Sequence, residues 1–355
     1  MVRRWIILIF LIVFISGCGV QKEILDDVSL ESGISFDFYK EGQILGTALV
    51  PNYQPDKSIK NVTYQAISAM NRELIIEMQR QIADPLVSGS LEVVLFGDTL
   101  ARRGIIDLID AMQRDATIGE RLYLIVVDGK ANDLLTHNYG TSGNATYISN
   151  LMKQNIVSRD LPQTNLHLFI FDFFQQGKDP FLPLVKRIGK DRMVINGLCL
   201  FKKDKLITTL PTSKMFFFKL LADKYSEGTY KVKVNGEEAA VRSIRSNHRF
   251  DISNKDPNKI TIHIKIKGQI REYSGNKLSP KAIKLIENNL EKLVNKECLK
   301  LINQFQEKGI DPLGLGHYAK SQTRKFNFKK WEQNYQNVKV NIKSNVEIID
   351  AGVIE

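Results

Sequence analysis

The sequence has few of the residues that build disulfide scaffolds or zinc sites. Its 355 residues include three cysteines and five histidines, which excludes a disulfide-stapled fold and leaves little material for a zinc site. Its N-terminal apolar run, Trp5–Ile15, has eleven residues, whereas a helix needs ~20 to cross a bilayer. With 43% apolar and 25% charged residues, the chain has an ordinary globular composition rather than that of a polytopic membrane protein.

The usual nucleophile and phosphate-binding motifs are also missing. The sequence contains no Gly-x-Ser-x-Gly elbow, no Gly-x-x-x-x-Gly-Lys-Ser/Thr loop and no Gly-x-Gly-x-x-Gly loop. Ser142 and Ser213 have no convincing histidine partner, and Gly314-Leu315-Gly316 is too short to hold a phosphate. We expect Ser142 and Gly314–Gly316 to lie in turns.

Acidic pairs and cysteines offer no clear chemistry either. Asp107 with Asp110, and Glu287 with Glu291, lie opposite apolar helix stripes, so we expect them to be solvated rather than to form a catalytic dyad. The same holds for Asp26 beside Asp27. We expect Cys199 and Cys298 to be two buried free thiols, although a disulfide between them remains open. The sequence therefore predicts no catalytic residue, no metal site and no cofactor.

The N-terminus has the layout of a bacterial lipoprotein signal. Arg3 and Arg4 precede the apolar run, which ends in Ile15-Ser16-Gly17-Cys18. This ending is similar to a lipobox, in which small residues precede a cysteine whose thiol accepts diacylglycerol. We predict that residues 1–17 are removed and that Cys18 becomes the lipidated first residue, although an ordinary signal peptide with a chance cysteine is the alternative. Two or more acyl chains would anchor the protein stably on the outer face of a membrane.

The net charge of +11 is concentrated in the second half of the chain. Residues 1–195 carry 20 Lys and Arg against 22 Asp and Glu, while residues 196–355 carry 30 against 17. A basic surface can attract nucleic acid, anionic lipid or an acidic partner. Because the export signal places the protein outside the cytoplasm, we expect no nucleic-acid partner. The basic half is instead expected to face lipid headgroups or a membrane protein.

The first half, residues 18–195, is predicted to be an α/β domain. Leu91–Phe96 and Leu122–Val127 are typical of buried strands, and the helical pattern of Gly104–Met112 lies between them. Val62–Ile82 is predicted to be a helix, because apolar residues recur at spacings of three and four. Leu166–Phe174 is predicted to be a core strand, with an aromatic ligand surface as the alternative. Prolines 180 and 183 are expected to break the following segment, and Met193–Phe201 with Lys205–Leu210 to form a hairpin.

The second half, residues 196–355, is predicted to be a basic α+β domain. Thr229–Val234, Ala239–Ile252 and Ile260–Ile270 have strand patterns. In the last of these, isoleucines at even positions from Ile260 to Ile266 alternate with polar residues that include Lys265 and Lys267, which predicts a sheet with one wet face. Residues 280–308 are predicted to be a helix, with Ser279 as its N-cap, Pro280 at its first position and Gly309 as its stop signal. Val338–Ile349 is predicted to close the domain as a strand pair, and Met215–Phe218 to be a buried helix or contact patch. The predicted fold is therefore α+β and multi-domain.

Several segments of the chain form a recognisable series. In chain order they are Cys18, Val93–Gly97 with Leu100–Gly104, Ile195–Leu198 with Phe201–Leu206, Asp311–Gly316, Trp331 and Val338–Gly352. Together they resemble the Ger(x)C family, the lipoprotein C subunits of nutrient germinant receptors in endospore-forming bacteria. The resemblance covers nearly the whole chain.

This resemblance implies a non-enzymatic protein that Cys18 anchors at the inner spore membrane. Its implied partners are two integral-membrane proteins, the A and B subunits, and the complex would trigger germination in response to nutrients. It implies no catalytic residues and leaves open whether this subunit contacts the germinant. We expect a scaffold or relay that binds partners through the face of Lys265 and Lys267, or through the segment around Gly314, Gly316 and Trp331. The alternatives without a partner are that the lysines only keep the protein soluble and that Trp331 is a core residue.

Two other classes of lipoprotein remain as alternatives. A solute-binding lipoprotein would share the lipobox, but it would have two similar α/β lobes around a cleft. A cell-wall hydrolase would need a catalytic acid or metal set, which this sequence does not suggest.

Overall fold

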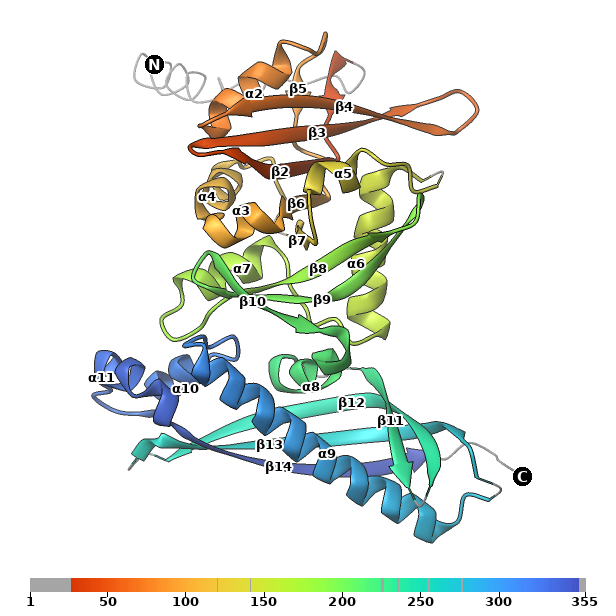
Figure 1. Cartoon of the computed structure of the whole chain (residues 1–355), viewed down its shortest axis with the longest axis vertical. Helices are drawn as coiled ribbons and strands as arrows, with labels where there is room; N and C mark the ends of the chain where they lie inside the picture. Colours follow the sequence, from red (N-terminus) through yellow and green to blue (C-terminus); the bar gives the residue numbers. More distant parts are fainter. Residues whose placement is uncertain are drawn as a thin grey trace, which may run out of the picture.

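The computed structural model describes residues 27–350, apart from residues 120, 141, 225–226, 235, 254–255 and 276. Cys18 and the predicted signal peptide lie outside the described residues. Figure 1 shows an elongated molecule, with β2, β3, β4 and α2 at one end of its long axis and a second sheet with a long helix at the other.

Within the described part of the chain, the strands form one eight-stranded sheet, one four-stranded sheet and a two-stranded pair. In the structure, the first half of the chain extends to Pro211, where the eight-stranded sheet is complete, and the second half starts at Thr212. The elements of the first half are β1 (Ser29–Leu30), β2 (Gly33–Lys40), β3 (Gln43–Tyr53), β4 (Ile59–Ser68), α2 (Asn71–Gln79), β5 (Leu86–Val87), β6 (Val93–Gly97), α3 (Asp98–Arg103), α4 (Ile106–Arg114), β7 (Tyr123–Val127), α5 (Ala131–Leu135), α6 (Asn144–Ser158), α7 (Leu166–Phe174), β8 (Phe181–Ile188), β9 (Arg192–Lys202) and β10 (Lys205–Pro211). Those of the second half are α8 (Thr212–Ala222), β11 (Gly228–Val234), β12 (Glu237–Ser253), β13 (Asp256–Tyr273), α9 (Pro280–Glu307), α10 (Leu315–Gln322), α11 (Phe328–Gln333), the 3₁₀ helix η2 (Tyr335–Asn337) and β14 (Lys339–Asp350).

The first sheet has a parallel centre with antiparallel arms, in the order β10-β9-β8-β7-β6-β2-β3-β4. Strands β2, β6, β7 and β8 run parallel. The central strands are apolar on both faces because helices cover both. In β6, Val94 and Phe96 pack in the core under α2, α3, α4 and α7, whereas Val93 and Leu95 pack in the core under α5, α6 and α8. The predicted strand-helix-strand unit is thus confirmed, as is the β9–β10 hairpin.

The second sheet has the order β11-β12-β13-β14, with α9 connecting the parallel strands β13 and β14. The isoleucines from Ile260 to Ile266 are at most 1% exposed, while Lys265 and Lys267 are exposed, so the predicted register is confirmed. Helix α9 begins as predicted, because the Ser279 hydroxyl accepts a hydrogen bond from the Ala282 N–H at 3.2 Å. It ends before Gly309, whose φ is 64°. The α+β, multi-domain prediction is correct.

The predicted division at residue 195 falls within β9, and the first sheet continues to Pro211. Where the two domains divide therefore stays a prediction. The described parts of the two halves have different sheets, one mixed and one mainly antiparallel.

The predicted helix over Val62–Ile82 is wrong in its first half. Residues 59–68 form β4, which pairs with β3 over its whole length, and only Asn71–Gln79 is helical. The helical spacing came from Leu74 and Met78, which are buried, whereas Ile67 and Met70 are exposed. Pairing with a neighbouring strand decided the structure here, which local periodicity does not report.

The predicted core strand over Leu166–Phe174 is also wrong, because this segment is helix α7. The Asn165 side chain caps it by accepting a hydrogen bond from the Leu168 N–H at 2.8 Å. Leu166, Phe169 and Asp172 are its buried residues, which gives a spacing of three. Pro183 does not break the next segment either, since it lies inside β8.

Two predictions about the second half need correction. Val338–Ile349 is one strand, β14, rather than a pair. Glu287 and Glu291 are not solvated, because their carboxylates accept hydrogen bonds from the N–H groups of Ile348 and Val346, each at 2.9 Å. These α9 side chains satisfy the backbone donors on the outer edge of β14, which would otherwise lack partners.

Candidate functional site

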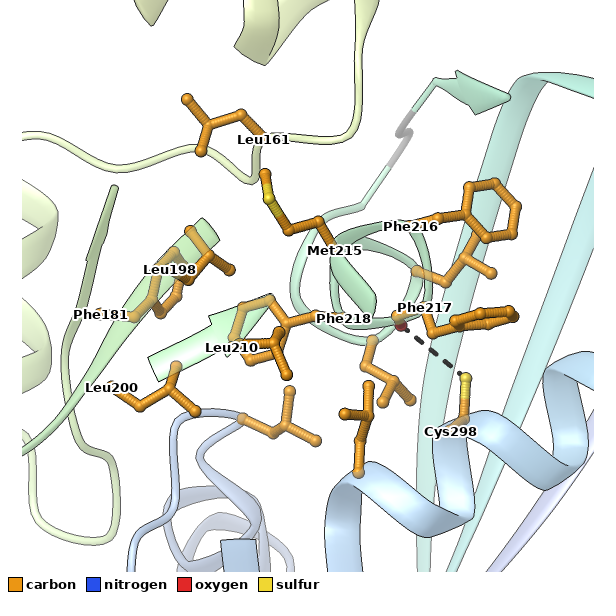
Figure 2. Close-up of a cluster of buried hydrophobic side chains, with 14 of the residues drawn as sticks. Leu161, Phe181, Leu198, Leu200, Leu210, Met215, Phe216, Phe217, Phe218 and Cys298 are labelled. Atoms are coloured by element: carbon orange, nitrogen blue, oxygen red, sulfur yellow. Dashed lines mark hydrogen bonds between the residues drawn. The ribbon is translucent and has the colours of Figure 1, made fainter. Parts of the chain in front are cut away.

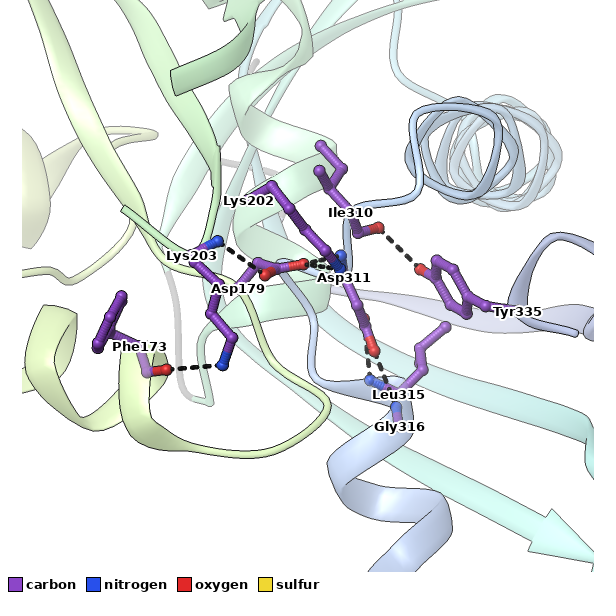
Figure 3. Close-up of polar contacts among 9 residues, drawn as sticks. All are labelled: Phe173, Asp179, Lys202, Lys203, Ile310, Asp311, Leu315, Gly316 and Tyr335. Carbon is purple, nitrogen blue, oxygen red and sulfur yellow. Dashed lines mark hydrogen bonds and ion pairs between the residues drawn. The ribbon is translucent and has the colours of Figure 1, made fainter. Parts of the chain in front are cut away.

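The two halves of the chain meet where the loop before β8 contacts the segment after α9. The Asp179 N–H donates to the Asp311 carbonyl at 2.9 Å, and the His317 N–H donates to the Gly177 carbonyl at 3.0 Å. We call this contact, made by residues 176–179 and 309–317, the joint (Figure 3). Direct backbone hydrogen bonds between segments so distant in sequence fix the two halves against each other.

Asp179 is the central polar group of the joint and is 2% exposed. One carboxylate oxygen accepts from the Asp311 N–H at 2.8 Å and from the Lys202 ammonium at 3.2 Å. The other oxygen accepts from the Lys203 N–H at 3.1 Å. One side chain thus connects the β9–β10 turn of the first half to the second half.

Asp311 organises the other side of the joint. Its carboxylate accepts hydrogen bonds from the N–H groups of Leu315 at 3.0 Å and Gly316 at 2.8 Å, which are donors at the start of α10. Burial raises the pKa of Asp311 to about 7, despite these hydrogen bonds. The Tyr335 hydroxyl donates to the Ile310 carbonyl at 3.0 Å, and burial raises the pKa of Tyr335 as well.

Two glycines allow the backbones of the joint to touch. Gly177 has a φ of 82°, and a Cβ there would lie 2.6 Å from the Gly316 carbonyl carbon and the His317 nitrogen. A Cβ on Gly316 would lie 2.7 Å from the Trp331 ring. Gly314, Gly316 and Trp331 are buried against this chain's own residues, so the alternative of a core tryptophan is confirmed and these three residues do not themselves form a partner surface.

Helix α8 joins the two halves through a shared apolar core (Figure 2). Phe218 stacks edge-on with Phe181 of the first sheet and with Phe305 of α9, at centroid distances of 5.1 and 5.9 Å. One buried apolar cluster includes residues of the first sheet, α8, α9 and the second sheet. The prediction of a buried helix for Met215–Phe218 is confirmed, since each of the four is at most 4% exposed.

A cleft of about 480 Å³ opens beside the joint, lined by residues that include Gln176, Lys202, Lys203, Asp311 and Trp331. Its lysines already have partners within the chain: Lys178 pairs with Asp172 at 2.8 Å, Lys202 binds Asp179, and the Lys203 ammonium donates to the Phe173 carbonyl at 3.0 Å. The geometry supports a structural connection more directly than a reaction centre.

The residues considered for chemistry remain apart. Ser142 and Ser213 are exposed, and the five histidines lie on or beside five different elements. Asp107 is exposed, and Asp110 forms an ion pair with Arg114 at 2.7 Å. Cys199 and Cys298 are free and buried, as predicted. Over the ranges that the structure describes, no group of three or more His, Cys, Asp or Glu is placed to hold a metal ion.

Sequence reasoning did not find Asp179 or its pairing with Asp311. The glycines after α9 and the Asp311-Pro312 step mark a turn, but nothing local indicates which distant loop the turn contacts. None of the helices in the described part of the chain is long and apolar enough to span a membrane.

Comparisons with known proteins cover both halves. Residues 21–187 match the family model "Spore germination protein N-terminal domain", and residues 196–352 match "Spore germination B3/ GerAC like, C-terminal". Spore germination protein GerQC of Bacillus cereus is 29% identical over 361 residues, covering 99% of this chain and all of the relative. Putative spore germination protein YfkR of Bacillus subtilis (strain 168) is 22% identical over 298 residues, covering 80% of this chain and 77% of the relative. The crystal structure of GerBC has the same fold, with a TM-score of 0.59 at 18% identity, and covers 89% of this chain and 97% of GerBC.

Proposed function

The chain belongs to the Ger(x)C family of spore germination proteins, and from this premise we propose that it is a lipid-anchored, non-catalytic subunit of a nutrient germinant receptor. In this proposal, residues 1–17 are removed and the lipidated Cys18 holds the protein on the outer face of the inner spore membrane. Residues 18–195 and 196–355 form its two domains. The match to the N-terminal family model ends at residue 187 and the match to the C-terminal model begins at residue 196, which supports a domain division near residue 195.

Its partners in this proposal are the two integral-membrane A and B subunits. The joint is the observation that carries the relay role. The buried Asp179 and Asp311 bond the two halves directly, and α8 shares one core with both sheets. Because tightly packed cores do not deform continuously, a displacement of one half would move the other half with it.

The exposed lysines of the second sheet are the proposed contact for an acidic partner. Within the described part of the chain, Lys265 forms no salt bridge. The Lys267 ammonium lies 3.8 Å from the Glu347 carboxylate, at the limit of a salt bridge. Charges held this loosely contribute little to stability. They are therefore free to contribute to association.

A germination assay on spores tests the proposal. Spores whose only copy of this subunit carries Cys18→Ala should show the protein missing from the membrane fraction and should respond poorly to the nutrient. Loss of the anchor lowers the effective concentration of the subunit beside its partners. Ser142→Ala, in an exposed loop, is the matched control and should behave as the parent. Full membrane retention and normal germination with Cys18→Ala would contradict the anchor.

The other lipoprotein classes make different predictions for the same purified protein. A solute-binding lipoprotein would bind amino acids or sugars at equilibrium, and a cell-wall hydrolase would turn over peptidoglycan. We expect no peptidoglycan turnover from this protein.

A further inference from the structure

The point where the described chain begins lies next to α2. The Ser29 N–H donates to the Pro85 carbonyl at 2.9 Å, and β1 pairs with β5. The Leu86 N–H in turn donates to the Gln79 side chain of α2 at 2.7 Å. Two hydrogen bonds therefore connect the start of β1 to the C-terminal end of this helix.

The length of residues 18–27 limits the distance between the start of the described chain and a lipid anchor at Cys18. Nine residue steps separate Cys18 from Asp27, which span at most roughly 30 Å even when fully extended. Figure 1 places α2 at one end of the long axis and the second sheet at the other. An anchor at Cys18 therefore favours the α2 end as the part nearest the membrane.

Helix α2 and the residue before it carry exposed apolar side chains that nothing in the described chain covers. Leu74 and Met78 are buried against the sheet, and this turns Ile75 and Ile76 outward, at 43% and 48% exposure. Met70, just before the helix, is 65% exposed. Three exposed large apolar side chains within one seven-residue stretch offer a lipid or a partner a contact surface.

The charges on and beside α2 cancel, so contact with lipid would come from burial of apolar side chains rather than from attraction between charges. Arg72 in the helix and Arg80 directly after it balance Glu73 and Glu77. Arg80 pairs with Glu77 at 2.7 Å, and Glu73 bonds to the Ser68 hydroxyl. A helix with no net charge gains little from anionic headgroups, whereas its isoleucines gain from entering the apolar boundary of the bilayer.

We propose that the outward face of α2, with Met70, Ile75 and Ile76, rests on the lipid surface beside the anchor. The basic face of the second sheet then lies at the far end of the molecule. This inference depends on the lipid anchor of the proposed function.

Lipid quenching of a fluorescent label tests this orientation. The full chain, processed in a lipoprotein-producing host, is reconstituted into phosphatidylcholine vesicles that contain spin-labelled lipid. A thiol-reactive fluorophore is placed on Ile76→Cys, and Lys265→Cys on the second sheet is the matched control. Cys199 and Cys298 are buried, so labelling of the parent chain measures any background.

We expect spin-labelled lipid to remove most of the fluorescence at position 76 and to leave position 265 unchanged. High salt should not alter this result, because screening weakens only charge attraction. Equal quenching at both positions, quenching at 265 alone or none at either would overturn the orientation. In spore membranes, a label at position 76 that is shielded from aqueous iodide but not quenched by lipid would overturn it in favour of a protein contact.

The mass of the N-terminal peptide from the same preparation separates this inference from the proposed function. A lipidated Cys18 without quenching at position 76 refutes the orientation alone. An unmodified N-terminus on a chain that washes off the vesicles refutes the anchor, and the orientation with it.

Discussion

Replacing Gly177 with alanine should open the joint between the two halves. At a φ of 82°, an alanine is strained by ~1–2 kcal/mol. Its Cβ would also lie 2.6 Å from two backbone atoms of the second half, and such overpacking costs typically ~1–3 kcal/mol. Because neither neighbour is a flexible side chain, the contact can relax only by moving the segments apart. The expected loss is therefore about 3 kcal/mol.

Gly189→Ala is the matched control for backbone strain. Gly189 has a φ of 62° in the β8–β9 turn, but a Cβ there would meet nothing within 4 Å. This variant should lose only about 1 kcal/mol. The difference between the two variants isolates the steric contact across the joint.

Urea unfolding with hydrogen exchange measures this difference. Gly177→Ala should lower the urea concentration at the midpoint of the first unfolding transition more than Gly189→Ala does. It should also speed exchange of the His317 N–H, which donates to the Gly177 carbonyl, while amides in the middle of the first sheet stay protected. Equal midpoints and equal protection at His317 in the two variants would refute the idea that this contact holds the halves together.

Three further predictions concern other parts of the molecule. Asp311→Ala leaves two N–H donors of α10 unpaired and should cost about 2–4 kcal/mol by urea unfolding, whereas Asp107→Ala at an exposed site should stay within ~0.5 kcal/mol; equal losses would contradict the role of Asp311. Because burial raises the pKa of Asp311 from 3.8 to about 7, the folded state holds this proton more tightly than the unfolded state, so stability should fall as the pH rises from about 4 to about 7; Asp311→Asn should reduce that slope in urea midpoints, and an unchanged slope would exclude this carboxyl as its source. Charge reversal of Lys265 and Lys267 to glutamate should leave stability within ~0.5 kcal/mol but weaken salt-sensitive co-purification with the membrane subunits, and unchanged binding together with unchanged germination would remove the basic face from the mechanism.

Patterns confined to one element predicted much of the fold. The alternation from Ile260 to Ile266 identified a sheet with one covered face, because a strand repeats every two residues. The Ser279 cap and the Gly309 stop defined α9, because both act through nearby backbone groups. Burial of Cys199 and Cys298 followed from the apolar neighbours of each.

Most of the errors arose where distant segments decide the structure. Strand β4 follows β3 rather than its own helical spacing. The error at α7 was local, because the Asn165 cap three residues before Leu168 favoured a helix in an aromatic run that is also suited to a strand. Glu287 and Glu291 have a helical pattern typical of solvated residues, yet β14 lies beside them. The joint was missed for the same reason, since Asp179 and Asp311 are 132 residues apart.

The most direct test of the central proposal is affinity purification of this chain from detergent-solubilised spore membranes, followed by mass spectrometry of the whole complex. The proposal predicts an N-terminal peptide that starts at a lipidated Cys18, together with two integral-membrane germination proteins. A chain with an unmodified N-terminus, recovered without integral-membrane partners, would contradict it.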